Sequence, residues 1–108
     1  MIHTDKVKLM DSGTVFFQAE NREEAVAKVL LALKGAELEE YAPGAFLADF
    51  SDAFFYSVVR AVVEPMSEEG RFVASFQEAN RCRCILYPFP SRKAWRRMAR
   101  IKAAVAGE

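Results

Sequence analysis

A chain of 108 residues has the length of one domain, and 52% hydrophobic residues are enough to build an apolar core without disulfides or metals. Charged residues make up 28% and aromatic residues 12%, a composition that excludes the intrinsically disordered class. The first residues lack the apolar core of a signal peptide, and the longest apolar run is interrupted by Ser57 and Arg60, so no membrane segment is expected.

The charges cancel in sum but are divided along the chain. Residues 1–80 hold 7 basic and 14 acidic side chains, and only Glu108 is acidic after residue 80. Residues 81–102 carry no acidic side chain and eight basic ones: Arg81, Arg83, Arg92, Lys93, Arg96, Arg97, Arg100 and Lys102. This division is the strongest functional signal in the sequence, and it defines a surface and not a reaction.

The first elements are a strand and a helix. Residues 7–20 predict one bent strand, or a hairpin around Asp11-Ser12-Gly13, because β-branched and aromatic residues follow that turn. Residues 21–35 predict a helix, in which Asn21 and Glu24 form a capping box and Gly35 ends it. Its apolar residues recur at a spacing of three to four and predict a core-facing stripe.

Residues 36–52 are the least regular part of the sequence. An acidic run precedes the turn signal of residues 41–44, and we expect a long connection with a short helical turn near residues 45–50. The glutamates of the run, Glu37, Glu39 and Glu40, could in principle pair for acid–base or metal chemistry. Since no second histidine or aspartate cluster accompanies them, a solvated loop is the preferred interpretation.

A meander of strands is expected next. Residues 53–64 fit a helix or a strand, and we prefer a strand because residues 71–77 alternate as a half-buried strand after a turn at 65–70. Residues 77–80 are predicted to reverse the chain. On a last strand, residues 81–87, alternation places Cys82 and Cys84 inward and Arg81 and Arg83 outward.

Residues 91–106 predict a second helix, capped by Ser91 and followed by Gly107. At 100° per residue, one side collects Ala94, Trp95, Met98, Ile101 and Val105. The basic residues Arg92, Lys93, Arg96, Arg97 and Arg100 fan across the opposite side. Trp95 is expected to be a core or interface anchor, with a base-stacking platform as the alternative.

Together these elements predict one α+β domain over residues 1–108, with a mostly antiparallel sheet of three to five strands and helices 21–34 and 91–106 on one face. The order resembles the α-β-β-β-α order of double-stranded-RNA-binding domains, and Ser91-Arg92-Lys93-Ala94 is similar to the serine and basic pair that open their last helix. Tyr87-Pro88-Phe89-Pro90 replaces the glycine-bearing approach of that family, so the resemblance is one of order and implies no membership.

The sequence offers no catalytic or metal-binding pattern. It contains no Gly-rich phosphate loop, no Ser/His/Asp or Cys/His arrangement and no metal-ligand spacing, so we expect no enzyme activity, cofactor or metal. His3 is interpreted as solvated. A thiolate at Cys82 or Cys84 activated by Arg81 and Arg83 is the enzymatic alternative, but the alternation turns the thiols away from these arginines. Zinc shared between two copies is the metal alternative.

The basic helix face suggests three interpretations: a solvated surface, a nucleic-acid backbone site, or a site for an acidic protein surface. The last is preferred, because the acidic first part of a neutral chain repels a polyanion from every other side. The predicted partner-binding residues are Arg92, Lys93, Arg96, Arg97 and Arg100, with Arg81 and Arg83 adjoining. We therefore expect a cytoplasmic inhibitor or adaptor, of a size common in bacterial or mobile-element systems, with DNA or RNA binding as the alternative and a homodimer allowed by charge complementarity.

Overall fold

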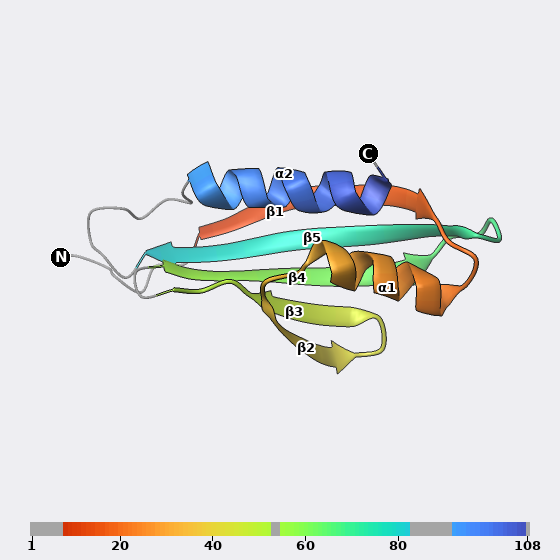
Figure 1. Cartoon of the computed structure of the whole chain (residues 1–108), viewed down its shortest axis with the longest axis horizontal. Coiled ribbons are helices and arrows are strands. Elements are labelled where there is room, and N and C mark those ends of the chain that lie inside the picture. Colours follow the sequence, from red (N-terminus) through yellow and green to blue (C-terminus); the bar gives the residue numbers. More distant parts are fainter. Residues whose placement is uncertain (1–7, 53–54, 83–91, 108) are drawn as a thin grey trace.

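Five strands form one antiparallel sheet, and two helices cover one of its faces (Figure 1). The computed structural model describes residues 8–52, 55–82 and 92–107. The chain order is β1 (Lys8–Gln18), α1 (Arg22–Ala32), β2 (Glu37–Ala42), β3 (Ala45–Asp49), β4 (Phe55–Pro65), β5 (Arg71–Cys82) and α2 (Arg92–Ala106). Across the sheet the order is β1-β5-β4-β3-β2, and every neighbouring pair is antiparallel. The predicted α+β architecture is confirmed.

The core lies between the helices and the facing side of the sheet. Side chains of β4 and β5 alternate between buried and more exposed positions, as the period of two in a strand requires. The buried side chains of the central strands are Val59, Ala61 and Val63 on β4 and Phe72, Ala74 and Phe76 on β5, and the helices add Ala25, Val29, Leu33, Met98, Ile101 and Val105. The buried members of the two predicted stripes form the helical side of this core, whereas Trp95, which was predicted in the second stripe, is exposed.

The strand predicted at residues 7–20 and the helix predicted at residues 21–35 are confirmed. Residues 8–18 form a single bent strand and not a hairpin, because the register with β5 shifts between Asp11 and Gly13, and Gly13 has φ 82°. Asn21 caps α1 by accepting a hydrogen bond from the Glu24 backbone N–H at 2.8 Å. Gly35, with φ 98°, follows the end of the helix.

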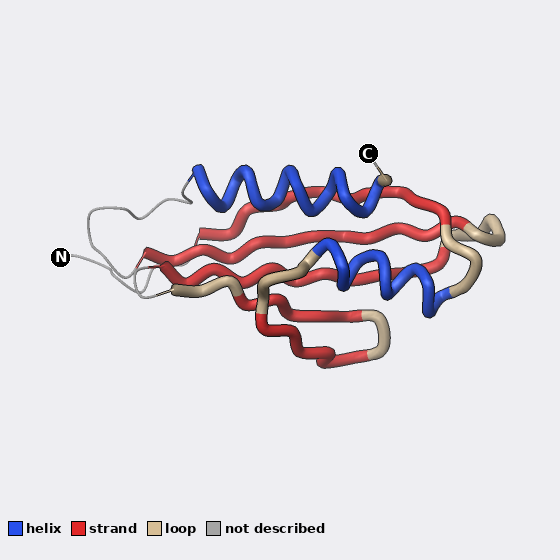
Figure 2. Tube along the Cα trace, in the orientation of Figure 1, coloured by secondary structure: helices blue, strands red, loops and turns tan. Residues whose placement is uncertain are grey.

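The turn predicted at residues 41–44 is confirmed, but the long connection and the helical turn predicted around it are wrong, because residues 37–49 form the hairpin of β2 and β3 at the edge of the sheet farthest from β1 (Figure 2). All six side chains of β2 are exposed, so no burial alternation marks it in the sequence. Its backbone pairing with β3 decides the structure instead. Gly44 makes the turn with φ 76°, and a Cβ there would lie 2.9 Å from the Val63 carbonyl oxygen.

The predicted chain reversal at residues 77–80 is also wrong, whereas the strand preferred for residues 53–64 is confirmed as β4. β5 continues through these residues to Cys82 and pairs with β1 on one side and β4 on the other. Residues 81 and 82, the start of the separate strand predicted at 81–87, therefore belong to β5, and residues 83–91 lie outside the described residues. The described residues between α1 and α2 already form four strands, not three, so the order shared with double-stranded-RNA-binding domains does not hold. No helix of the described chain has the length and apolarity to cross a membrane.

Candidate partner-binding face

Helix α2 rests on the sheet through a narrow apolar stripe. Met98, Ile101 and Val105, which recur at a spacing of three to four, are almost completely buried. The helix packs against β1 and α1, and no acidic residue occurs between Arg92 and Gly107. Every charged side chain of the helix is therefore basic, and its position around the axis decides what it can do.

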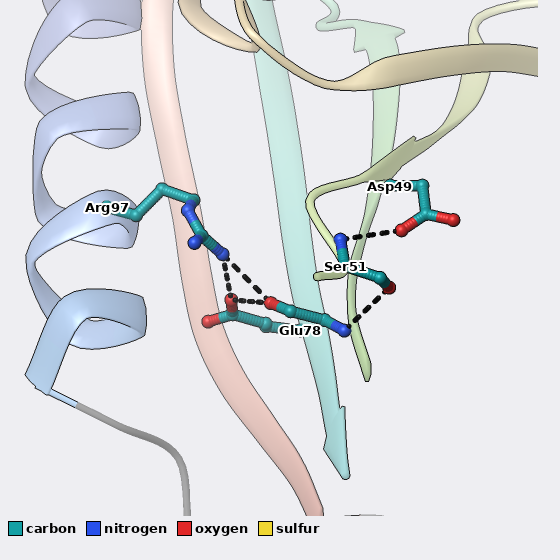
Figure 3. A network of polar contacts seen from close by, with 5 residues as sticks. Asp49, Ser51, Glu78 and Arg97 are labelled. Carbon is teal, nitrogen blue, oxygen red and sulfur yellow. Dashed lines mark hydrogen bonds and ion pairs between the residues drawn. The ribbon is translucent and has the colours of Figure 1, made fainter. Parts of the chain in front are cut away.

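Arg97 does not lie on the exposed basic side where helical periodicity placed it. Its side chain is only 10% exposed and extends from the helix toward Glu78 of the sheet, as Figure 3 shows. A cleft of about 580 Å³ between the end of α1 and α2 is lined by Arg97 and Arg100 on one side and by Lys34, Glu37 and Asp49 on the other, so Arg97 lies on the flank of α2 that faces α1. This corrects the prediction that all five basic residues form one outward fan.

The guanidinium of Arg97 joins a buried polar network (Figure 3). Its Nη1 donates to Ser57 Oγ at 2.9 Å and lies 3.5 Å from Glu78 Oε1, and the Ser57 hydroxyl donates to the same carboxylate oxygen at 3.1 Å. Glu78 is completely buried, and Ser57 is 4% exposed. The ring of Phe50 lies 4.4 Å from the Arg97 guanidinium carbon. The guanidinium of Arg97 thus contacts β4, β5 and the loop that follows β3.

The same network fixes the connection between β3 and β4. Ser51 Oγ accepts a hydrogen bond from the Ser57 backbone N–H at 3.0 Å, and Asp49 Oδ1 accepts one from the Ser51 N–H at 2.8 Å. The Phe50 N–H donates to the Ser57 carbonyl at 2.8 Å. Residues 49–51 are therefore bound to the strand that carries Ser57, which keeps Phe50 under the guanidinium of Arg97.

Burial lowers the pKa of Arg97 below its usual value, because desolvation disfavours the charged form. The negative charge of Glu78 opposes this shift, Arg100 adds to it through like-charge repulsion, and Asp52 opposes it. An arginine starts so far above neutral pH that it keeps its proton under physiological conditions. Arg97 and Glu78 accordingly act as a buried ion pair, which fixes α2 on the sheet.

The exposed side of α2 is smaller than the sequence suggested. We define the outer face of α2 by four exposed residues in its first half, Trp95, Arg96, Ala99 and Arg100; Ala104 and Ala106 are exposed nearer its end. Trp95 is 58% exposed, so the prediction that it packs in the core is wrong, and its role as an interface anchor stays a prediction. Among the described residues, neither Arg96 nor Arg100 has an ion-pair partner within 4.0 Å.

The different exposure of the Trp95 and Arg97 side chains has a geometric cause. At 3.6 residues per turn, the two positions flank the buried stripe on opposite sides, roughly 90° and roughly 70° from its centre. The flank of Arg97 faces α1 and the strand that carries Glu78, whereas the flank of Trp95 faces away from α1. The sequence presents both positions as borderline, and only the neighbouring elements decide which side chain is buried.

The remaining predicted site residues are placed only in part. Arg92 and Lys93 begin α2 and Arg81 lies near the end of β5, but their side chains are not among those described, and Arg83 lies outside the described residues. The joining of strand and helix arginines into one patch therefore stays a prediction. The same holds for the inward thiols, since Cys84 and the side chain of Cys82 are not described.

Sequence analysis missed Glu78 as a structural residue. The signal was present, because Glu78 continues the inward register of Phe72, Ala74 and Phe76 at steps of two. A carboxylate in such a register requires a buried cation or hydrogen-bond donor. Its place in a polar tetrapeptide, Gln77-Glu78-Ala79-Asn80, led instead to the interpretation as a turn.

The protein is therefore a five-stranded antiparallel α+β domain in which a basic helix is bound to the sheet by one buried arginine, Arg97, and exposes two others, Arg96 and Arg100. Comparison with protein-family models and with curated proteins found no match. In the described ranges 8–52, 55–82 and 92–107, no three or more histidine, cysteine, aspartate or glutamate side chains gather to hold a metal ion.

Proposed function

We propose that this protein is a non-enzymatic binding module of the inhibitor or adaptor type, which acts in the cytoplasm and engages an acidic protein surface through the outer face of α2. The observation that carries the proposal is that α2, which packs on the sheet through a buried stripe, exposes a tryptophan and two arginines, Trp95, Arg96 and Arg100, on the sides that the stripe leaves uncovered. Tryptophan and arginine are the residue types most enriched at the energetic centres of protein interfaces.

The charge pattern supports a partner of negative charge. Arg96 and Arg100 are four residues apart, so they are neighbours on the helix surface, and their repulsion costs about 0.2–0.5 kcal/mol. In α2 no glutamate or aspartate compensates for it. A carboxylate placed between the two guanidinium groups would remove the repulsion and accept bidentate hydrogen bonds.

The buried ion pair supports the proposal indirectly. Arg97 anchors α2 at its middle, between the positions of Arg96 and Arg100, so the outer face is presented on a fixed helix and not on a loop. A preorganised surface loses less conformational entropy on binding. The network therefore serves the proposed function by positioning, while the exposed residues make the contacts.

Trp95 is the only tryptophan of the chain, so its fluorescence reports directly on this face. We would titrate the protein with a glutamate-rich peptide that carries one leucine, and separately with single- and double-stranded DNA and RNA. We expect a saturable change of Trp95 emission as the peptide is added. The affinity derived from this titration should fall with salt, and the double variant Arg96→Ala with Arg100→Ala should lower it at least about tenfold.

Arg60→Ala is the matched control, because Arg60 is an exposed arginine of β4, which is not part of the outer face of α2. It should leave the titration unchanged. A response to nucleic acid alone, lost in the same double variant, would replace the proposal by the nucleic-acid alternative. An equal loss in the Arg60 variant would show that the response follows total charge, and would contradict a site on α2.

A further inference from the structure

A cleft of about 480 Å³ opens where the C-terminal end of α2 meets α1 and the edge strand β1. The two helices lie side by side on one face of the sheet (Figure 1). We call this space the Arg71 cleft. Its basic lining residues are Lys28 and Arg71, and its most exposed large apolar residues are Phe16 and Leu31. Among the described residues, no acidic side chain lines it, in contrast to the cleft beside Arg97.

The apolar part of the cleft is open to solvent. Leu31 is 74% exposed and Phe16 is 55% exposed, although both side chains are large and apolar. On the α2 side, the small residues Ala104, Ala106 and Gly107 line the cleft and leave room beside them. Single exposed apolar side chains are normal on a protein surface, but several of them around one hollow are typical of a ligand site. An aliphatic chain in the cleft would remove this apolar surface from water.

The two cations of the cleft differ in how far the protein compensates their charge. Lys28 Nζ donates to the Gln18 carbonyl oxygen at 2.8 Å and lies 3.7 Å from Glu24 Oε1. No carboxylate of the described residues lies within 4.0 Å of the Arg71 guanidinium. The Arg71 Nε is buried, and in the same part of the chain no acceptor meets it. A buried donor without an acceptor calls for an explanation, and an anion bound next to this guanidinium would provide one.

Neighbouring negative charge lowers the positive potential at Arg71 without forming an ion pair with it. Arg71 and Lys28 also line a second hollow, which contains Glu20, Glu24 and Glu69. Glu24 is paired with Lys28, and within the described ranges neither Glu20 nor Glu69 comes within 4.0 Å of the Arg71 guanidinium. The C-terminal end of α2 adds a partial negative charge of about half an elementary charge. The direct contact with the guanidinium is therefore left to a ligand in the cleft.

We propose that the Arg71 cleft binds a carboxylate that carries an aliphatic chain, as in a medium-chain fatty acid. The carboxylate accepts hydrogen bonds from the planar Arg71 guanidinium, and the chain lies against Phe16 and Leu31. An inorganic anion leaves the apolar part uncovered, and a neutral aliphatic molecule leaves Arg71 without a counter-charge. No residue of the outer face of α2 lines the cleft, so the inference goes beyond the proposed function and does not depend on it.

Nuclear magnetic resonance titration of the isotopically labelled full chain tests the inference with three probes: octanoate, octanol and acetate. The backbone amide signals of residues 28–32 and 104–107 report on the cleft. We expect octanoate to shift these signals saturably, with one molecule bound per chain. Octanol lacks the charge and acetate lacks the chain, so each should bind at least about tenfold more weakly. Shifts that never saturate, or equal affinities for octanoate and octanol, would overturn the inference.

Two substitutions separate the charged and the apolar part of the site. Arg71→Gln should lower the affinity for octanoate to that for octanol, and Leu31→Ser should weaken the binding of both probes. The matched controls are Arg60→Gln and Leu38→Ser, since both residues are exposed and neither lines the cleft. The controls should bind octanoate like the wild type, and a loss of binding in either of them would contradict the assignment.

The double variant Arg96→Ala with Arg100→Ala distinguishes this site from the outer face of α2. It should leave octanoate binding unchanged while it weakens binding of the glutamate-rich peptide. A double variant that loses octanoate as well would place the fatty-acid chain on the outer face and overturn the inference. Circular dichroism checks the fold of each variant, and the Leu31 variant and the octanol comparison decide the outcome if Arg71→Gln does not fold.

Discussion

Arg96 and Arg97 are neighbours in the sequence and belong to opposite environments. Arg97 is nine-tenths buried, held by Ser57 and Glu78, and stacked on Phe50, whereas Arg96 stands in solvent beside Arg100. The same side-chain chemistry thus fixes the helix in one case and is available for a partner in the other. The comparison teaches that the buried and the exposed charges of a helix have to be distinguished before a binding function is assigned to them.

The largest expected effect is on the buried side of this comparison. Glu78→Ala leaves the buried Arg97 without its carboxylate, and we expect a loss of about 3–5 kcal/mol in the free energy of unfolding. Urea denaturation measures this loss. Arg96→Ala is the exposed counterpart and should change stability by less than about 0.5 kcal/mol. Equal losses in both variants would mean that Arg97 and Glu78 do not form a stabilising pair.

Ser57→Ala tests the hydroxyl that links the two charges. Its removal takes one acceptor from Arg97 and one donor from Glu78, and we expect a loss of about 1–3 kcal/mol. Ser75→Ala on β5 is the matched control, since Ser75 is exposed. If the two variants melt at the same temperature, the hydroxyl contributes nothing to the network.

Trp95→Ala separates binding from folding on the exposed side. Since Trp95 is 58% exposed, its removal should cost less than about 0.5 kcal/mol in stability. The same change should weaken binding of the glutamate-rich peptide at least about tenfold, which isothermal titration calorimetry measures. Met98→Ala is the contrasting variant, because it empties a buried position and should cost about 2–5 kcal/mol. A large stability loss in the Trp95 variant would identify it as a core residue.

The smallest effect has the opposite sign. Arg96→Glu removes the repulsion with Arg100 and creates an attractive pair at a spacing of four, so α2 should gain about 0.2–0.5 kcal/mol per interaction. Thermal unfolding at low salt measures the gain, and high salt should reduce it. Binding of the acidic peptide should decrease in the same variant. Stability and binding that change in the same direction would contradict the idea that the exposed arginines serve a partner.

Local sequence was sufficient wherever a periodic apolar pattern met a capping or turn residue. The helix at residues 22–32, the strand at 71–77 and the buried stripe of Met98, Ile101 and Val105 followed from spacing, whereas the strand at 55–65 fitted a helix equally and was preferred because a strand follows it. These elements are amphipathic, so the spacing of their apolar residues directly predicts which side chains are buried. The α+β class follows from them.

Other features were decided by tertiary structure. The strand β2 is exposed along its whole length and is recognisable only through its pairing with β3, because backbone hydrogen bonds do not depend on the side-chain pattern. Likewise, the sequence determined that α2 is basic and amphipathic, but only the position of α1 and of Glu78 decided that Arg97 is buried while Trp95 and Arg96 are exposed. The physical reason is that both flanks of a helix stripe are equivalent until a neighbouring element covers one of them.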